Sequence, residues 1–458
     1  MLASRDWEAL AGAIVGELVL PGSPRYEAVR KPDIARFHDV RPQAVVRCAT
    51  PADVAETIRF ARRWGLPAVP RSGGHCFAGC SSTSGIVIDV TPMQSVSLAG
   101  DVATVGAGVR LGEVYDALAR HHHTIPAGCG ATVGIAGLTL GGGLGILGRA
   151  HGLTCDHLLS AQVVLADGRI VECDQRREEE LFWALRGAGG GQFGVVTSLA
   201  FRTLPAPATT VFHLTWPHTR AWAVLDAWQA WAPDAPGELA ASLLVTAVAE
   251  AGQPPVVKVF GAMLGGEADT TALLEELVAR TGADPSATVC KQLSHREAKR
   301  YLTEAGPAEE RPLAHAWSKS EFFARPLPTE TVTALVDHLA GERAAGQSRE
   351  LDFSPWAGAY NRVRADATAF VHRNARFLLK HAVAIEPDTP EAQRQAARQW
   401  LARSWAIVHP WGTGGVYPNF PDPDLDDPAG AYFGANRHRL ARVKARYDPD
   451  SFFRFGNP

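Results

Sequence analysis

Residues 133–168 read VGIAGLTLGGGLGILGRAHGLTCDHLLSAQVVLADG, where closely spaced glycines give way to a strand-like run and a tight turn. Two further glycine clusters lie at residues 72–74 and 187–194. Glycine lets the backbone approach a ligand closely, and clustered backbone N–H groups bind anions such as pyrophosphate. Three clusters in one part of the chain, one of them followed by a histidine, therefore predict a large phosphate-bearing cofactor.

The glycine spacing GxGxxG occurs twice, from Gly143 to Gly148 and from Gly189 to Gly194. In a Rossmann dinucleotide site this spacing needs a strand before it, a helix after it and an acidic residue further on. The second copy leads into the strand-like run VVTSLAF, and the acid that follows the first, Asp167, lies in a predicted turn. A Rossmann domain is therefore not expected.

The order of helix-like and strand-like segments predicts an α+β fold. Thr50 and Pro51 are typical of a helix start, and Asp167 with Gly168 predicts a hairpin between two β-rich runs. Residues 1–20 read as an amphipathic helix. The sequence PAPATT at residues 205–210 marks a boundary between predicted structural regions. The residue composition changes again near residue 411.

The length of 458 residues favours two domains, and 46% hydrophobic with 20% charged residues indicates a globular protein with a sizeable core. A net charge of -3 gives no electrostatic reason to expect nucleic acid or an anionic membrane as a partner. The chain has no apolar run of about 18 residues and no signal-peptide pattern at its start. We therefore expect a cytoplasmic protein whose seven cysteines, none of them in a CxxC pair, are mostly buried thiols.

Three segments together resemble the FAD-binding segments of flavoprotein oxidases related to vanillyl-alcohol oxidase: RSGGH (71–75), the run 133–168 and LFWALRGAGGGQFGVVT (181–197). YPNFPD (417–422) and YFGANRHRLARVKARYDPDSFF (432–453) resemble the C-terminal segment of the berberine-bridge-enzyme-like branch. The resemblance implies an α+β, two-domain PCMH-type FAD-binding fold. Its expected parts are residues 1–205 for the first part of the FAD domain, 206–410 for the substrate-binding domain and 411–458 for the segment that completes the FAD domain.

The resemblance implies that His75 bonds covalently to the C8α methyl group of FAD. A neutral imidazole suits this role, because its lone pair is a nucleophile at physiological pH. A solvent-facing turn histidine is the alternative interpretation. The other residues that the resemblance assigns to the cofactor are Arg71, Ser72, Gly73, Gly74, Gly79, Gly134, Gly137, Leu138, Gly141, Gly142, Gly143, Gly145, Gly194, Val195, Val196, Tyr417 and Asn419.

Many relatives attach the flavin a second time, through a cysteine in a G-x-C-x-x-V-G pattern. In this chain Gly130 stands at the position of that cysteine, and Cys129 comes one residue earlier. We therefore predict that His75 alone attaches the flavin. Cys129 remains an alternative anchor if the loop has a compensating irregularity.

Two residues are candidates for a part in the chemistry. By resemblance, Val133 lies near the flavin C4a, where a small side chain goes with oxidases. Tyr417 matches the first tyrosine of the YxNY motif, the family's usual base, and Phe420 replaces the second tyrosine. A free phenol has a pKa of about 10, so Tyr417 needs a cationic neighbour or the flavin environment to act as a base at neutral pH. A core tyrosine bonded to the backbone is the alternative.

Several other residues have a structural and a functional interpretation. Lys380 alternates with apolar residues on a predicted strand, and it either points into a cavity or lies at a solvent edge. His372 and Arg373 are expected to orient the structure. The run 121–123 of three histidines ends a predicted helix, and we expect no metal site. Three tryptophans either line an apolar pocket or belong to the core: Trp356, Trp405 and Trp411.

The resemblance implies an FAD-dependent oxidase that transfers hydride from a small organic substrate, an alcohol, amine or secondary metabolite, to flavin N5. Oxygen is the expected electron acceptor and hydrogen peroxide the expected product. The alternatives are a carbohydrate or oligosaccharide oxidase, a dehydrogenase with another acceptor, and a flavin-carrying binding protein without turnover. The sequence does not predict the oligomeric state.

Overall fold

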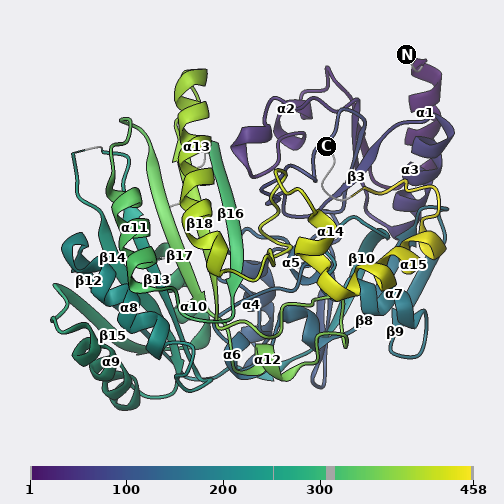
Figure 1. Cartoon of the computed structure of the whole chain (residues 1–458). Helices are drawn as coiled ribbons and strands as arrows, with labels where there is room; N and C mark the ends of the chain where they lie inside the picture. Colours follow the sequence, from purple (N-terminus) through teal and green to yellow (C-terminus); the bar gives the residue numbers. More distant parts are fainter. Residues whose placement is uncertain (1–2, 251, 306–314, 455–458) are drawn as a thin grey trace.

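The computed structural model describes residues 3–250, 252–305 and 315–454, which contain three sheets of four or more strands (Figure 1). The first sheet has the order β1-β2-β4-β3 and is parallel except at β1, which pairs antiparallel with β2. Its elements and neighbouring helices are α1 (Ser4–Ala13), β1 (Glu17–Val19), α2 (Tyr26–Val29), β2 (Ala44–Arg47), α3 (Pro51–Arg63), β3 (Ala68–Arg71) and β4 (Ile86–Asp89).

Helix α3 begins as its sequence predicts. The Thr50 hydroxyl accepts a hydrogen bond from the N–H of Asp53 at 3.2 Å, and the Asp53 carboxylate accepts one from the N–H of Thr50 at 3.1 Å. Pro51 is the first helical residue. This reciprocal pairing satisfies N–H groups that the first helical turn leaves without partners.

The helix expected over residues 1–20 is too long, and that part of the prediction is wrong. Helix α1 ends at Ala13, and strand β1 pairs with β2 a few residues later. Gly16 permits this pairing, because a Cβ atom there would lie 2.0 Å from the carbonyl oxygen of Arg47. The apolar residues at the end of the expected helix therefore pair along a sheet edge.

The second sheet is antiparallel, with the order β5-β6-β10-β8-β9. The expected hairpin is confirmed, since β8 and β9 pair around Asp167 and Gly168, and Gly168 has a φ of +83° that favours glycine. The elements are β5 (Val96–Ala99), β6 (Val102–Gly106), α4 (Leu111–Ala119), β7 (His123–Thr124), α5 (Ile135–Leu140), α6 (Gly148–His151), β8 (Leu158–Leu165), β9 (Ile170–Asp174), α7 (Glu179–Leu185), β10 (Gly194–Arg202) and β11 (Leu204–Pro205), which pairs with β7.

The third sheet has seven antiparallel strands in the order β15-β12-β14-β13-β17-β18-β16. Helices α8, α11 and α13 share one core with its strands, and α10 packs on the other face, against Val211 and Ala262. The elements are β12 (Thr209–Pro217), α8 (Ala221–Trp231), β13 (Leu239–Ala247), β14 (Val256–Leu264), α9 (Glu267–Thr281), β15 (Ala287–Leu293), α10 (His295–Ala305), β16 (His315–Phe323), α11 (Thr329–Ala340), β17 (Ser348–Pro355), α12 (Ala359–Arg362), β18 (Phe377–Ile385) and α13 (Glu391–Val408).

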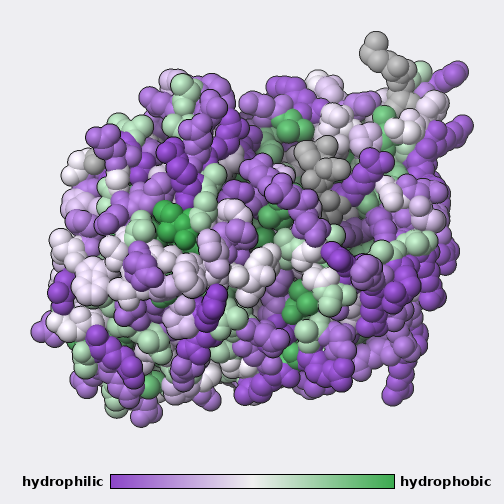
Figure 2. All heavy atoms as spheres, in the orientation of Figure 1, coloured by the Kyte–Doolittle hydropathy of each residue, from purple (hydrophilic) through white to green (hydrophobic). Residues whose placement is uncertain are grey.

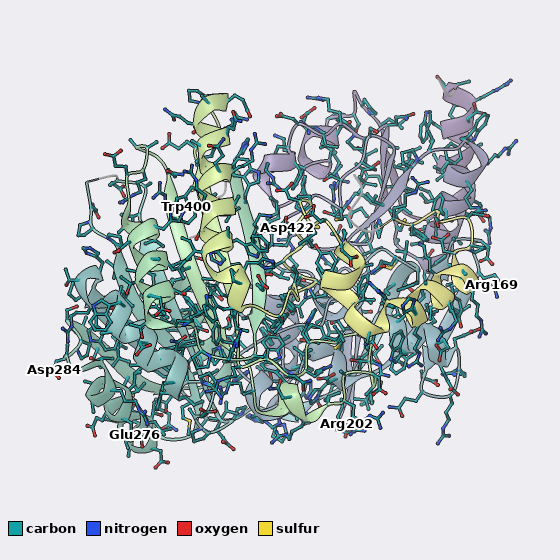
Figure 3. The ribbon with its side chains drawn as sticks, in the orientation of Figure 1. Arg169, Arg202, Glu276, Asp284, Trp400 and Asp422 are labelled. Atoms are coloured by element: carbon teal, nitrogen blue, oxygen red, sulfur yellow. The ribbon has the colours of Figure 1, made fainter. Side chains whose placement is uncertain are left out.

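The C-terminal segment crosses back to the first two sheets, as the yellow ribbon in Figure 1 shows. It contains α14 (Pro428–Phe433) and α15 (Arg437–Tyr447), and Leu440 and Val443 of α15 belong to the core of the first two sheets. Asp422, labelled in Figure 3, lies on this segment. Its carboxylate accepts a hydrogen bond at 2.7 Å from the Lys319 ammonium of β16. The C-terminal segment therefore contacts the first two sheets through α15 and the third sheet through Asp422.

The surface has the polar character that the composition predicts for a globular protein (Figure 2). The face in Figure 2 is mostly hydrophilic, with hydrophobic residues in small separate groups. Within the described ranges, no helix is long and apolar enough to cross a membrane.

Candidate active site

A cavity of about 340 Å³ lies among the three glycine-rich segments and residues 417–421 of the C-terminal segment. Chain segments far apart in the sequence therefore build one wall. Of the predicted cofactor residues in the described part of the chain, Gly79, Gly141, Gly142, Gly143 and Gly145 do not line this cavity. The predicted residues that line it are Arg71, Ser72, Gly73, Gly74, His75, Val133, Gly134, Gly137, Leu138, Gly194, Val195, Val196, Tyr417 and Asn419.

The glycines of this wall leave room for a large group. Gly73 and Gly134 lie back to back, since a Cβ atom on Gly73 would lie 2.3 Å from the nitrogen of Gly134. Gly137 also lines the cavity, and the position of its missing Cβ has no atom within 4 Å. A ligand can therefore approach the backbone closely at this point, and the cavity fits a phosphate-bearing cofactor such as FAD.

His75 lies at the cavity wall with one ring nitrogen engaged. Its Nε2 is 3.1 Å from a carboxylate oxygen of Asp33 and 3.0 Å from the hydroxyl of Thr132. Burial lowers the pKa of His75, although the Asp33 carboxylate acts in the opposite direction. The lowered pKa favours the neutral imidazole, and a proton on Nε2, toward the Asp33 carboxylate, would leave the lone pair on Nδ1.

A second cavity of about 290 Å³ adjoins the first and reaches to the third sheet. The two cavities share four wall residues: Gly128, Gly130, Leu144 and Phe420. Phe260, Trp356 and Tyr360 give the second cavity aromatic walls, and Asp352 and Lys380 add charged groups. Gly145 lines this second cavity. A substrate bound there would lie next to a cofactor in the first cavity.

Lys380 lies inside the molecule, so the solvent-edge interpretation is wrong. Strand β18 pairs with β16 on one side and with β17 on the other, which makes Lys380 a residue of an inner strand. Its side chain is 4% exposed and lines the second cavity, with Nζ 3.7 Å from Asp352 and 3.8 Å from Glu350. Its ammonium also lies 5.1 Å from the ring centroid of Phe420. The cavity interpretation is the one that the structure bears out.

Tyr417 is buried, and three N–H groups point at its phenolic oxygen. These are the N–H groups of Gly143 at 3.0 Å and Leu144 at 3.1 Å, and the side-chain amide of Asn419 at 3.1 Å. Burial raises the pKa of Tyr417 to about 12, and the three hydrogen bonds oppose that rise. A neutral phenol oxygen has two lone pairs and a phenolate oxygen has three, so three donors suit the ionised form.

Gly141 and Gly143 act on this arrangement although they do not line the first cavity. A Cβ atom on Gly141 would lie 2.1 Å from the side-chain oxygen of Asn419. The Asn419 amide also donates to the carbonyl of Leu138 at 2.9 Å. These glycines therefore let Asn419 and Tyr417 pack against the 138–144 segment.

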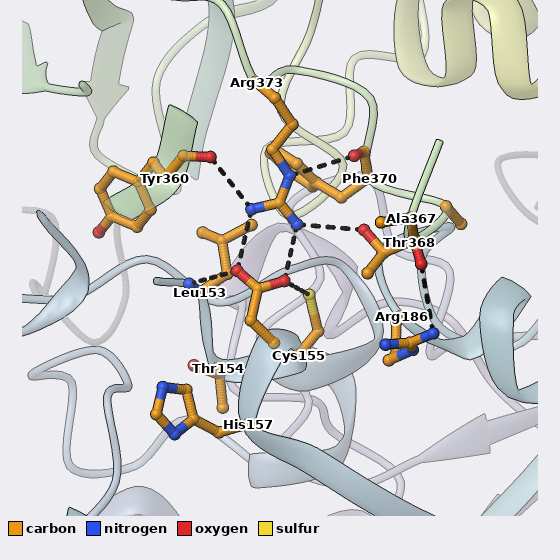
Figure 4. A network of polar contacts seen from close by, with 12 residues as sticks. Leu153, Thr154, Cys155, His157, Arg186, Tyr360, Ala367, Thr368, Phe370 and Arg373 are labelled. Carbon is orange, nitrogen blue, oxygen red and sulfur yellow. Dashed lines mark hydrogen bonds and ion pairs between the residues drawn. The ribbon is translucent and has the colours of Figure 1, made fainter. Parts of the chain in front are cut away.

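Arg373 is held by a buried network of polar contacts (Figure 4). Its guanidinium binds both carboxylate oxygens of Asp156, at 2.9 and 2.7 Å, and also contacts the Thr368 hydroxyl at 3.1 Å. Asp156 also accepts a hydrogen bond from the N–H of Leu153 at 2.9 Å. The expectation that Arg373 orients the structure agrees with this pairing.

Of the remaining sequence candidates, one lines the second cavity and the others are half-buried away from it. Trp356 lines the second cavity, whereas Trp405 stacks on His409 and Trp411 lies under Arg325. The ring of His372 stacks on that of Phe322, and burial lowers the pKa of His372 to about 4. Among the described residues, no histidine, cysteine or acid cluster could hold a metal ion.

Lys299, a buried lysine next to Cys129, was not among the residues expected from the sequence. Its ammonium donates to the carbonyl of Ala127 and lies 3.2 Å from the hydroxyl of Tyr115 and 3.4 Å from the carbonyl of Gly128. Cys129 itself lines the second cavity, and its carbonyl accepts a hydrogen bond from Thr303 at 2.6 Å. Helix α10 thus holds the loop that separates the two cavities, and no local pattern around Lys299 could have predicted this long-range contact.

We expect Lys299→Met to lower the free energy of unfolding by about 2–3 kcal/mol, because the buried carbonyl of Ala127 and the hydroxyl oxygen of Tyr115 would lose their donor. Chemical denaturation checks this value. Arg300→Met on the exposed side of the same helix is the matched control, with an expected change below about 0.5 kcal/mol. Equal stability of the two variants would contradict the assignment.

Comparison with known proteins identifies the two parts of the first cavity. Residues 42–174 match the family model described as "FAD binding domain", and residues 416–458 match the one described as "Berberine and berberine like". These segments contribute the first two glycine clusters and the Tyr417 segment to the cavity wall.

Two relatives are similar over nearly the whole chain. The uncharacterized FAD-linked oxidoreductase YvdP of Bacillus subtilis is 33% identical, over 96% of this chain and 97% of its own length. The chitooligosaccharide oxidase of Gibberella zeae is 30% identical, over 90% of this chain and 86% of its own length.

A solved structure, wild-type BBE-like 1 of Physcomitrella patens, superposes with a TM-score of 0.88 and 26% identity, covering 99% of this chain and 98% of that one. The expected α+β PCMH-type fold is thereby confirmed, and so is FAD as the cofactor of an oxidoreductase. The chain is a member of the berberine bridge enzyme-like family of FAD-linked oxidoreductases.

Proposed function

We propose that this protein is an FAD-dependent oxidase of a small organic substrate, an alcohol, amine or secondary metabolite. Residues 1–205 and 411–458 would hold FAD, and residues 206–410 would bind the substrate. The observation that carries this proposal is the wall that the two cavities share at Gly130 and Phe420. A cavity with aromatic and charged walls thus adjoins the glycine-lined cavity, which supports binding of a substrate beside the cofactor.

FAD, when bound, would supply a hydride acceptor at N5, and oxygen would take up the two electrons and form hydrogen peroxide. Tyr417 is the proposed base, and it would take the proton from the substrate O–H or N–H group on its phenolic oxygen. The three N–H donors at that oxygen hold its position and favour the ionised form. Val133 lines the cofactor cavity. We propose that its small side chain leaves oxygen access to the flavin.

His75 is the proposed attachment point of the flavin, through a bond to its C8α methyl group. The contacts of Nε2 with Asp33 and Thr132 support this, because they leave the lone pair on Nδ1. We propose that this is the one covalent bond. Cys129 lines the second cavity and burial raises the pKa of its thiol, which argues against a second attachment there.

A carbohydrate oxidase is the second candidate function. Ser242, Thr303 and Asp352 line the second cavity and could bind sugar hydroxyl groups, and a relative similar over most of the chain is a chitooligosaccharide oxidase. Peroxide release with oligosaccharides, measured beside small alcohols and amines, separates the two. Reduced flavin that persists in air would instead favour a dehydrogenase with another acceptor. The cytoplasmic location stays a prediction.

The attachment is tested by mass mapping of acid-precipitated protein. We expect the flavin mass on the tryptic peptide that contains His75, and we expect His75→Ala to release the flavin on precipitation. His38→Ala is a matched control that should keep the bond, since His38 contacts the carbonyl of Pro32. Flavin on the Cys129 peptide, or flavin still bonded in His75→Ala, would contradict a single bond at His75.

A further inference from the structure

Two cysteines lie on the loop that directly follows His75. Cys76 and Cys80 are brought together by a tight turn, in which the N–H of Gly79 donates to the carbonyl of Cys76 at 3.0 Å. Gly79 has a φ of +77°, a conformation that suits glycine. The N–H of Cys80 then donates to the sulfur of Cys76 at 3.3 Å. The loop therefore closes on itself with the two cysteines on one side.

The surroundings of Cys76 favour its thiolate. A hydrogen bond from the Cys80 thiol and the neighbouring backbone N–H groups lower the pKa of Cys76 to about 7, although the partial burial of the thiol acts in the opposite direction. The guanidinium of Arg36 donates to the carbonyl of Phe77 between the two cysteines, and the charges of Arg36 and Cys76 interact. A positive group beside a hydrogen-bonded sulfur is typical of a reactive cysteine.

The other cysteines differ in this respect. Burial raises the pKa of each of the other five: Cys48, Cys129, Cys155, Cys173 and Cys290. Cys76 and Cys80 are also both partly exposed, and both line the cofactor cavity. Both thiols therefore face the cofactor cavity, and the lowered pKa favours the thiolate of Cys76.

We propose that Cys76 and Cys80 form a reversible dithiol–disulfide site on the flavin loop. In the oxidising direction the Cys76 thiolate attacks one sulfur of a small-molecule disulfide and releases one thiol. The Cys80 sulfur then attacks the Cys76 sulfur, loses its proton and releases the second thiol. Two protein thiols are oxidised to one S–S bond, and one small disulfide is reduced to two thiols.

Cys76 and Cys80 are partly exposed and so depart from the expectation that the cysteines are mostly buried thiols. A bond between Cys76 and Cys80 would close the turn that follows His75 and fix the backbone of the flavin loop. The redox state of the surroundings would then set the stiffness of one wall of the cofactor cavity. The proposal does not depend on the substrate or on the electron acceptor.

The test uses the full-length protein as purified, first reduced and then incubated with glutathione disulfide at pH 7.5. The sample is acid-quenched, alkylated with N-ethylmaleimide and digested with trypsin. The peptide 72–110 contains both cysteines and no others. After incubation we expect this peptide to carry no alkyl label and to be lighter than the reduced, unlabelled peptide by two hydrogens. Treatment with dithiothreitol before alkylation should restore both labels.

Single variants test the order of the two attacks. In Cys80→Ser the Cys76 thiolate should keep a stable glutathione adduct, because the resolving thiol is missing. In Cys76→Ser the adduct on Cys80 should form at least about tenfold more slowly. Cys290→Ser is the control and should leave the internal disulfide unchanged. A fully labelled wild-type peptide, two separate glutathione adducts, or a bond to a cysteine outside this peptide would overturn the proposal.

Discussion

Tyr417→Phe is expected to slow the reduction of the flavin by substrate by about 10²- to 10⁴-fold, the usual range for loss of a general base. The change removes only the oxygen that receives the N–H groups of Gly143, Leu144 and Asn419. The ring would keep its edge-to-face contact with Phe420, 5.0 Å between centroids. Anaerobic stopped-flow absorbance of the flavin measures the rate directly.

The pH dependence gives a second test of the same role. Burial raises the pKa of Tyr417 to about 12, so its phenol is protonated at neutral pH and its ionised fraction grows about tenfold per pH unit below that value. We therefore expect kcat/KM of the wild-type enzyme to rise with pH through the neutral range. In Tyr417→Phe this rise should disappear.

Tyr26→Phe is the matched control, because it removes a buried hydroxyl that donates to the carbonyl of Pro42, away from both cavities. It should reduce the flavin at close to the wild-type rate. A Tyr417→Phe enzyme that keeps wild-type reduction and the same pH profile would show that another group takes the proton. FAD content measured on each variant separates a lost base from a lost cofactor.

The sequence predicted the features that depend on local chemistry. Glycines that approach one another closely, such as Gly73 and Gly134, cannot carry a side chain, so the cofactor segments are visible in the residue types themselves. The start of α3 was equally predictable, because Thr50 and Asp53 satisfy each other three residues apart.

Long-range pairing was not predictable from the same patterns. Lys380 appears in a strand pattern that suits an edge or an interior equally well, and only the strand order decides which. Lys299 contacts carbonyl groups about 170 residues away in sequence. The pairing of residues 17–19 with β2 likewise overrides the helical pattern that precedes it.

The pair of Arg373 and Asp156 is a further case, since the two residues are 217 positions apart. We expect Arg373→Met to lower the free energy of unfolding by about 3–5 kcal/mol, because it leaves the carboxylate of Asp156 buried without its main cation. The guanidinium is 1% exposed and the carboxylate 10%. Chemical denaturation of the variant, with unfolding followed by tryptophan fluorescence, measures the loss.

Two comparisons show whether the loss comes from the uncompensated carboxylate. The double variant Arg373→Met with Asp156→Leu should recover part of the stability, since it removes both buried charges. Arg364→Met breaks an exposed pair with Asp366 and should cost less than about 1 kcal/mol. If Arg373→Met were no more harmful than Arg364→Met, the buried network would not support the fold.

The same network should also influence the chemistry. Asp156 accepts the N–H of Leu153, and the N–H of the next residue, Thr154, donates to the carbonyl of Gly143 at 2.9 Å. Gly143 in turn donates its N–H to the oxygen of Tyr417. Arg373→Met should therefore slow flavin reduction even at temperatures where the variant remains folded, because a shift of Gly143 removes one of the three donors that favour ionised Tyr417.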